Sequence, residues 1–167
     1  QYDVWRAAAG ACPSVEHVVI FDPHVTLAAD NKMAIYYDEF LAMGQEATEA
    51  EAAVVKSRRE AGTPDDLATL IYTAGTTGEP KGVMLTHANY DEAMRIHLQR
   101  LVTCSDNDLS LCFLPLTHIF ERAWSYFCLT VGMRIAINHN PKEIQKAVKE
   151  IRPTLMCSVP RFWEKVY

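Results

Sequence analysis

Residues 109–137 read LSLCFLPLTHIFERAWSYFCLTVGMRIAI, and this stretch decides the fold. The apolar run at 109–114 predicts a buried strand, and residues 119–130 predict an amphipathic helix. Residues 134–137 predict a second strand. Two strands separated by a helix of this length are typical of a crossover unit in which the strands are parallel.

The same alternation continues on both sides of this unit. Further helices are predicted at residues 1–11, 39–61, 89–102, 141–152 and from 160 onward, and further strands at residues 17–21, 32–37, 67–73, 82–86 and 154–159. Asn89 and Glu92 have the spacing of a capping box at the start of the third of these helices. Strands separated by helices indicate a sheet covered on both faces. We therefore expect an α/β fold, a three-layer α/β/α arrangement with a mainly parallel sheet.

The composition excludes several classes of protein. The chain has 167 residues, 49% of them hydrophobic, so it is neither disordered nor too short to bury a core. Its net charge of −5 argues against a nucleic-acid partner. The five cysteines include no Cys-x-x-Cys pair, which argues against a disulfide framework or a zinc site. Neither a membrane span nor a signal peptide is recognised, so we expect a cytoplasmic protein.

Residues 72–83 read YTAGTTGEPKGV and connect two predicted strands. Glycine lets the backbone approach an anion closely, and backbone N–H groups, threonine hydroxyls and the Lys81 ammonium can then point at phosphate oxygens. The spacing is not that of a Walker loop, because Pro80 precedes Lys81 and Gly82 follows it. From composition alone, an ordinary turn rich in glycine and threonine is the alternative interpretation.

The order of residues in 72–83 resembles the phosphate loop of the adenylate-forming (AMP-binding) family of acyl-CoA synthetases, aryl-CoA ligases and peptide-synthetase adenylation domains. A second segment, LPLTHIFER at 114–122, resembles a core motif of the long-chain fatty acid–CoA ligase branch, as does VPRFWEKVY at 159–167. Residues 1–62 match only loosely. The resemblance implies that residues 1–167 are a fragment of the large N-terminal domain of such an enzyme, without its C-terminal domain.

The resemblance also implies the roles of individual residues. The loop holds the β- and γ-phosphates of ATP, and its nucleotide-binding residues are Thr73, Ala74, Gly75, Thr76, Thr77, Gly78 and Lys81. Thr76 matches the position that helps to hold Mg²⁺, a hard cation that bridges phosphate oxygens. The catalytic residues are Lys81, which steadies the leaving pyrophosphate, and His118, which orients the carboxylate or stabilises the adenylate. For the threonines and Lys81, turn capping and an exposed loop lysine are the alternatives.

The implied activity is that of a ligase with a fatty acid, ATP and coenzyme A as substrates. The carboxylate is joined to AMP with release of pyrophosphate, and the acyl group then passes to coenzyme A. A peripheral membrane contact and a homodimer are compatible with this activity. The fragment alone is expected to be inactive, because the family's downstream motifs are missing from it.

Two other functions stay open. One is an adenylating ligase for aryl or amino acids, which the LPLTHIFER segment disfavours. The other is a non-catalytic domain that keeps the fold, and Ala74 supports it because the family has Ser or Thr there. We further expect a local ion pair between Glu121 and Arg122. Trp124, Tyr126 and Phe127 are expected in the core, although they could border an acyl pocket, and His97 has a core or surface role.

Overall fold

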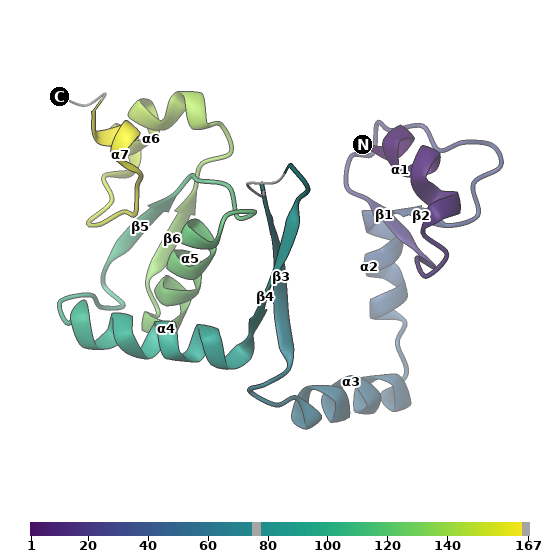
Figure 1. The fold of residues 1–167 in the computed structure, drawn as a ribbon, viewed down its shortest axis with the longest axis horizontal. Coiled ribbons are helices and arrows are strands. Elements are labelled where there is room, and N and C mark those ends of the chain that lie inside the picture. Colours follow the sequence, from purple (N-terminus) through teal and green to yellow (C-terminus); the bar gives the residue numbers. More distant parts are fainter. Residues whose placement is uncertain (75–77, 165–167) are drawn as a thin grey trace. The chain divides into compact units, whose positions relative to one another are not determined.

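The computed structural model describes residues 1–74 and 78–164, and the chain divides into two compact units, Gln1–Ala61 and Gly62–Tyr167 (Figure 1). The elements of the first unit, in chain order, are α1 (Tyr2–Ala8), the 3₁₀ helix η1 (Ala9–Ala11), β1 (Val18–Ile20), β2 (Ala34–Tyr36), α2 (Tyr37–Gln45) and α3 (Glu49–Ala61). Strands β1 and β2 are parallel, with Val18 opposite Ala34. The first helix and both strands of this unit agree with the sequence prediction.

The single helix predicted at residues 39–61 is wrong, because the structure has two helices there. Helix α2 ends at Gln45, and α3 begins at Glu49. Between them, the Thr48 N–H donates to Glu51 Oε2 at 2.7 Å, while Glu51 N–H donates to Thr48 Oγ1 at 3.3 Å. This reciprocal capping box satisfies free backbone groups at a new helix start, which offsets the loss of continuous helix.

The second unit carries the residues of functional interest. Its elements are β3 (Leu67–Thr73), β4 (Lys81–Thr86), α4 (His87–Arg100), β5 (Leu109–Cys112), α5 (Ile119–Val131), β6 (Arg134–Ile137), the 3₁₀ helix η2 (Pro141–Glu143), α6 (Ile144–Ile151) and α7 (Pro160–Trp163). Strands β5 and β6 are parallel, with Leu109 opposite Arg134. The crossover unit predicted at 109–137 is therefore confirmed.

Helices cover both faces of the β5–β6 pair. On one face, Met94 of α4 and Phe127 and Cys128 of α5 form a core cluster. On the other face, Leu111 of β5 packs with Ile144 of α6. Because successive side chains of a strand point to opposite faces, the two clusters lie on either side of the strands. The mixed α/β class with three layers and parallel strands is confirmed here.

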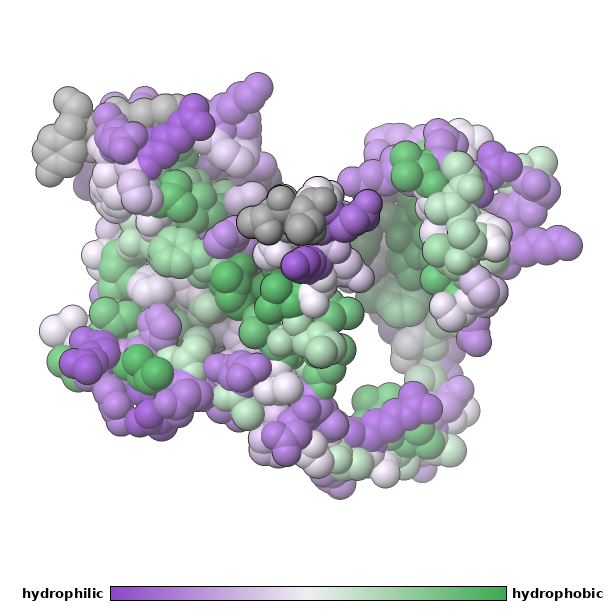
Figure 2. Space-filling model, in the orientation of Figure 1, coloured by the Kyte–Doolittle hydropathy of each residue, from purple (hydrophilic) through white to green (hydrophobic). Residues whose placement is uncertain are grey.

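Strands β3 and β4 depart from the parallel pattern. They form an antiparallel hairpin in which Thr73 lies opposite Lys81 and Ile71 opposite Val83. The seven residues between Thr73 and Lys81 are too few for a parallel crossover, so the chain turns straight back. Figure 2 shows a hydrophobic surface over this hairpin, where Leu70 and Met84 are exposed.

Two local predictions in this unit are wrong. The cap of α4 is Thr86 with Asn89, not Asn89 with Glu92, because the Asn89 N–H donates to Thr86 Oγ1 at 3.4 Å and the Thr86 N–H to Asn89 Oδ1 at 3.0 Å. Residues 154–159 form no strand, only a single parallel bridge from Leu155 to Ser110. The N–H groups of residues 154 and 155 both donate to the Leu109 carbonyl, at 2.9 and 3.4 Å, and the pairing with β5 does not continue beyond this bridge.

Candidate functional site

The β3–β4 hairpin presents the glycine-rich loop. Of the predicted nucleotide-binding residues, Gly75, Thr76 and Thr77 lie outside the described residues, and so does the magnesium prediction at Thr76. Thr73 and Lys81 are the last and first residues of the two strands and lie directly opposite each other. The hairpin therefore gathers the two ends of the predicted phosphate loop at one place.

The described part of the loop is exposed and contains one residue in the left-handed conformation. Thr73, Ala74, Gly78 and Lys81 are all exposed. Gly78 has a φ of +91°, a conformation that side chains with a Cβ rarely adopt. Among the described residues no carboxylate forms an ion pair with Lys81, so its ammonium can approach an anion from solution.

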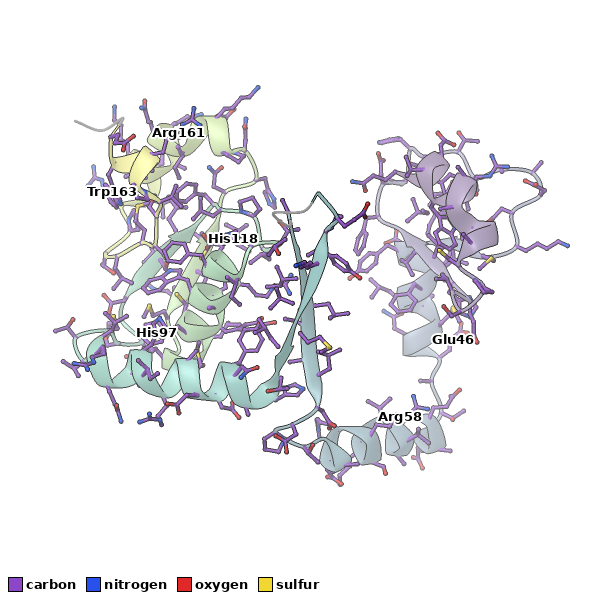
Figure 3. All side chains as sticks on the ribbon, in the orientation of Figure 1. Glu46, Arg58, His97, His118, Arg161 and Trp163 are labelled. Atoms are coloured by element: carbon purple, nitrogen blue, oxygen red, sulfur yellow. The ribbon has the colours of Figure 1, made fainter. Side chains whose placement is uncertain are left out.

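His118 lies at the N-terminal end of α5, where it caps the helix (Figure 3). The Phe120 N–H donates to His118 Nδ1 at 3.2 Å. Because a backbone N–H can only donate, Nδ1 of the neutral ring is the acceptor and Nε2 carries the hydrogen. The His118 N–H in turn donates to the Pro115 carbonyl at 3.0 Å, which closes a turn before the helix. The ring is thus oriented by the helix cap, and no hydrogen bond from its Nε2–H is formed to a residue of 1–74 or 78–164.

A cavity of about 480 Å³ lies beside His118. Its walls come from α4, α5 and the segment 157–160, and they include His97, Ala123 and Trp124. The surface is mostly apolar, and His118 is one of its few polar groups. A mostly apolar cavity with a few polar groups, among them His118, His97 and Ser158, is typical of a small-molecule site.

The aromatic residues of α5 divide between the core and this cavity. Phe127 is fully buried in the core, as predicted, and its ring lies 5.5 Å from that of Trp124. Trp124 also borders the cavity, and its Nε1–H donates to Ser110 Oγ at 2.9 Å. Tyr126 instead lines a second hollow of about 360 Å³ with Tyr90 of α4.

The ion pair predicted between Glu121 and Arg122 is wrong. Glu121 is 1% exposed, and its Oε2 accepts a hydrogen bond from the Leu114 N–H at 3.2 Å. Arg122 Nε donates to the Leu116 carbonyl at 2.8 Å, and its Nη1 donates to Thr69 Oγ1. The two residues are adjacent on a helix, so their side chains point to different sides and bind different partners. Both hold the turn that precedes His118.

The environment of Glu121 also affects the neighbouring thiols. Burial raises the pKa of Cys157 to about 12, and the Glu121 carboxylate adds to this effect. The pKa of Cys112 is also raised, by a hydrogen bond with Cys128, by burial and by Glu121. Cys112 and Cys128 are buried in the core, whereas Cys157 is half-buried and lines the cavity.

His97 is a cavity residue that the sequence interpretation missed. Its Nδ1 donates to the Ala93 carbonyl at 2.6 Å, and its ring lies 5.5 Å from the ring of Phe127. The spacing of Ala93, Met94 and His97 places all three on one face of α4, and Met94 is buried. That helical spacing was the signal that could have identified a histidine facing the core.

No group of three or more His, Cys, Asp or Glu side chains among the described residues has the arrangement of a metal site. No helix within residues 1–74 or 78–164 has the length and hydropathy needed to cross a membrane.

Similar sequences point to one family. Residues 11–167 match the family described as AMP-binding enzyme. Fatty acyl-CoA synthetase B of Dictyostelium discoideum is 33% identical over 155 residues, which cover 89% of this chain and 22% of that protein. The peroxisomal long chain acyl-CoA synthetase 6 of Arabidopsis thaliana is 41% identical over 107 residues, 62% of this chain and 15% of that protein. The chain thus spans less than a quarter of either relative.

A solved structure supports the same fold. O-succinylbenzoate coenzyme A synthetase (MenE) from Bacillus subtilis, in complex with ATP and magnesium ion, matches with a TM-score of 0.58 and 25% identity. The match covers 80% of this chain and 27% of that one. The expected architecture, part of the N-terminal region of an adenylate-forming enzyme, agrees with this likeness.

Proposed function

Because the chain belongs to the AMP-binding enzyme family, we propose that it is part of a long-chain fatty acid–CoA ligase. In the proposed reaction the fatty acid carboxylate attacks the α-phosphate of ATP, which gives an acyl-adenylate and pyrophosphate. The thiol of coenzyme A then attacks the acyl carbon, AMP leaves, and the thioester forms. The names of the two relatives, a fatty acyl-CoA synthetase and a long chain acyl-CoA synthetase, support this assignment.

The observation that carries the proposal is the position of His118. Its Nδ1 accepts from the Phe120 N–H, so its Nε2 carries the hydrogen, and the ring lines a mostly apolar cavity of about 480 Å³. An acyl chain would be buried against Trp124 and its neighbours at about 0.8 kcal/mol per methylene. The His118 N–H would then hydrogen-bond the carboxylate at the end of that chain, which keeps the attacking oxygen in a fixed direction.

The hairpin loop is the proposed site for the phosphates of magnesium-bound ATP. Its residues are Thr73, Ala74, Gly75, Thr76, Thr77, Gly78 and Lys81, with Thr76 beside the metal. Exposed Lys81 and the left-handed Gly78 fit this role, because the first supplies a positive charge and the second a turn open to an anion. Lys81 would neutralise charge on the departing pyrophosphate, which is what phosphoryl chemistry of this kind chiefly requires.

Pyrophosphate exchange tests this proposal directly. The full-length parent protein is incubated with ATP, labelled pyrophosphate and a single carboxylic acid, and label entering ATP is counted. We expect exchange with long-chain fatty acids and production of acyl-CoA when coenzyme A is added. Exchange with aryl or amino acids and none with fatty acids would refute it. The chain of 167 residues alone is expected to give no acyl-CoA.

Each of the two other candidate functions has one observation in its favour. The likeness to o-succinylbenzoate coenzyme A synthetase keeps an aryl acid among the substrates to be tested. Ala74, without the hydroxyl that family members have there, favours a non-catalytic domain. The mostly apolar cavity favours the fatty acid over both. A cytoplasmic location, a peripheral membrane contact and a homodimer are compatible with the proposed ligase.

A further inference from the structure

The hairpin and helix α5 are joined by one hydrogen bond between side chains. Arg122 Nη1 on α5 donates to Thr69 Oγ1 on β3. Within residues 1–74 and 78–164, it is the one side-chain hydrogen bond between the hairpin and α5. Thr69 precedes the start of the phosphate loop, and Arg122 follows His118 on the first turn of its helix.

The same guanidinium group also holds the turn that carries His118. Arg122 Nε donates to the Leu116 carbonyl at 2.8 Å, two residues before His118. A planar guanidinium presents its N–H groups in fixed directions, so binding at one side restricts what it can bind at the other. Glu121 fixes the beginning of this turn through the Leu114 N–H. The turn is therefore held at both ends by adjacent residues of α5.

Thr69 lies on the strand that leads into the loop, so its hydrogen bond to Arg122 can influence the position of the strand end. Thr69, Ile71 and Thr73 are two residues apart, so their side chains share one face of β3. Ile71 is 8% exposed and Thr69 is partly buried, so this face packs against protein along the middle of the strand, whereas Thr73 at its end is exposed. Thr73 is the last residue of the strand and ends about 13 Å from Thr69. A restraint at Thr69 thus acts on the strand whose last residue, Thr73, leads into the loop.

We infer that Arg122 is a positioning residue that fixes the distance between the glycine-rich loop and His118. The inference rests on the proposed function, in which the loop binds the phosphates and His118 the carboxylate. Attack of the carboxylate on the α-phosphate requires the attacking oxygen and the phosphorus atom to be at the right distance and orientation. Small misplacements lower the rate strongly. Binding of each substrate alone requires only one half of the site.

The test uses the full-length protein with Thr69→Val, which removes the hydroxyl and keeps the shape, and Thr69→Ser, which keeps the hydroxyl. For Thr69→Val we expect kcat of pyrophosphate exchange to fall about tenfold to a hundredfold, the effect of losing a hydrogen bond to a charged group. The KM values for ATP and fatty acid should change less than about threefold, because each substrate alone still binds to its own half of the site. Thr69→Ser should retain the rate.

A double mutant separates positioning from packing. In an Arg122→Gln background, Thr69→Val should cause no further loss of kcat, because the hydrogen bond is already gone. Thioester formation from purified acyl-adenylate and coenzyme A should stay unchanged in Thr69→Val, since the pyrophosphate has left by that step. Equal losses in Thr69→Val and Thr69→Ser, or a loss that appears as a raised KM for ATP, would overturn the inference.

Hydrogen exchange provides a readout that needs no activity. In Thr69→Val we expect the backbone amides of Leu114 and of residues 116–118 to exchange about tenfold faster than in Thr69→Ser, although the substitution is on β3. Equal exchange in the two variants would overturn the positioning role even if the parent enzyme is active. Conversely, a parent protein that does not catalyse pyrophosphate exchange would refute the proposed ligase. The hydrogen-exchange rates of the amides would still decide whether Thr69 and Arg122 are coupled.

Discussion

Thr154 Oγ1 donates a hydrogen bond to Asp108 Oδ1 across 2.7 Å, which joins the segment after α6 to the beginning of β5. The second oxygen of the same carboxylate accepts from the Ser105 N–H, also at 2.7 Å. Both bonds favour the ionised form, and they lower the pKa of Asp108, the Thr154 hydroxyl most and the Ser105 N–H next. The segment that ends at the cavity wall is therefore fixed by a carboxylate that must stay charged.

Asp108 should make the stability of the chain dependent on pH. Its pKa is lower in the folded state, so its contribution is complete above the unfolded value of about 3.9 and is lost as pH falls through the folded value. We expect Asp108→Asn to lower Tm at pH 7, and the difference from the unaltered protein to shrink below about pH 4. Asp106→Asn, at an exposed neighbouring position, is the control and should change Tm little. A difference that is the same at pH 3 and pH 7 would contradict this account.

His118 can be tested without disturbing the helix it caps. Asparagine is a good N-cap and can accept the Phe120 N–H, but its side chain is too short for its amide N–H groups to reach the position of the imidazole Nε2–H. We expect His118→Asn to keep Tm within about 2 °C and to lower kcat of fatty acid adenylation about tenfold to a hundredfold. His118→Ala should lower both. Full activity of His118→Asn would show that the imidazole serves the fold alone.

The cavity predicts a dependence on chain length. Ala123 lines the cavity from α5, and Ala123→Phe would fill part of its volume. Each methylene of substrate that can no longer be buried should lower kcat/KM about fourfold, so long chains should lose most and short chains least. Ala123→Ser, which hardly changes the volume, is the matched control. Kinetics with a series of fatty acids measures the effect, and an equal loss for all chain lengths would exclude the cavity as the acyl site.

Ala74 predicts a gain of activity. It is the first residue after β3, is exposed, and lies at the start of the phosphate loop. A hydroxyl at this position can donate to a phosphate oxygen, so Ala74→Ser should raise kcat of adenylation about tenfold to a hundredfold. Ala74→Val, with a larger side chain and no hydroxyl, should not. If the full-length protein is inactive with either Ala or Ser at position 74, the non-catalytic alternative is favoured.

The sequence predicted the elements whose residues follow a local rule. The apolar run of β5 and the amphipathic pattern of α5 were both recognisable, because each is a pattern of neighbouring residues whose apolar side chains face the core. The break at residues 46–48 was not predicted, because helix propensity is summed over a stretch and a capping box of Thr48 and Glu51 overrides it locally. The bridge at Leu155 depends on where Leu109 lies, and no local pattern contains that information.

The candidate site was predictable in its motifs but not in its connections. His118 and Lys81 stand in recognisable segments, and the order of residues was enough to single them out. Arg122, by contrast, was expected to pair with its neighbour, whereas it contacts Thr69, 53 residues earlier in the chain. A bond over that distance depends on the packing of two elements, which sequence spacing within either element does not specify.

The raised pKa of Cys157 has a consequence for a site that would make thioesters. An acyl-adenylate is a strong acylating agent, and a thiolate in the wall of the cavity would compete with coenzyme A and acylate the protein itself. With a pKa of about 12, only about one Cys157 side chain in 10⁵ is ionised at pH 7. Burial and the Glu121 carboxylate, which raise this pKa, would thus keep the Cys157 thiol protonated and unreactive toward an acyl-adenylate in the proposed enzyme.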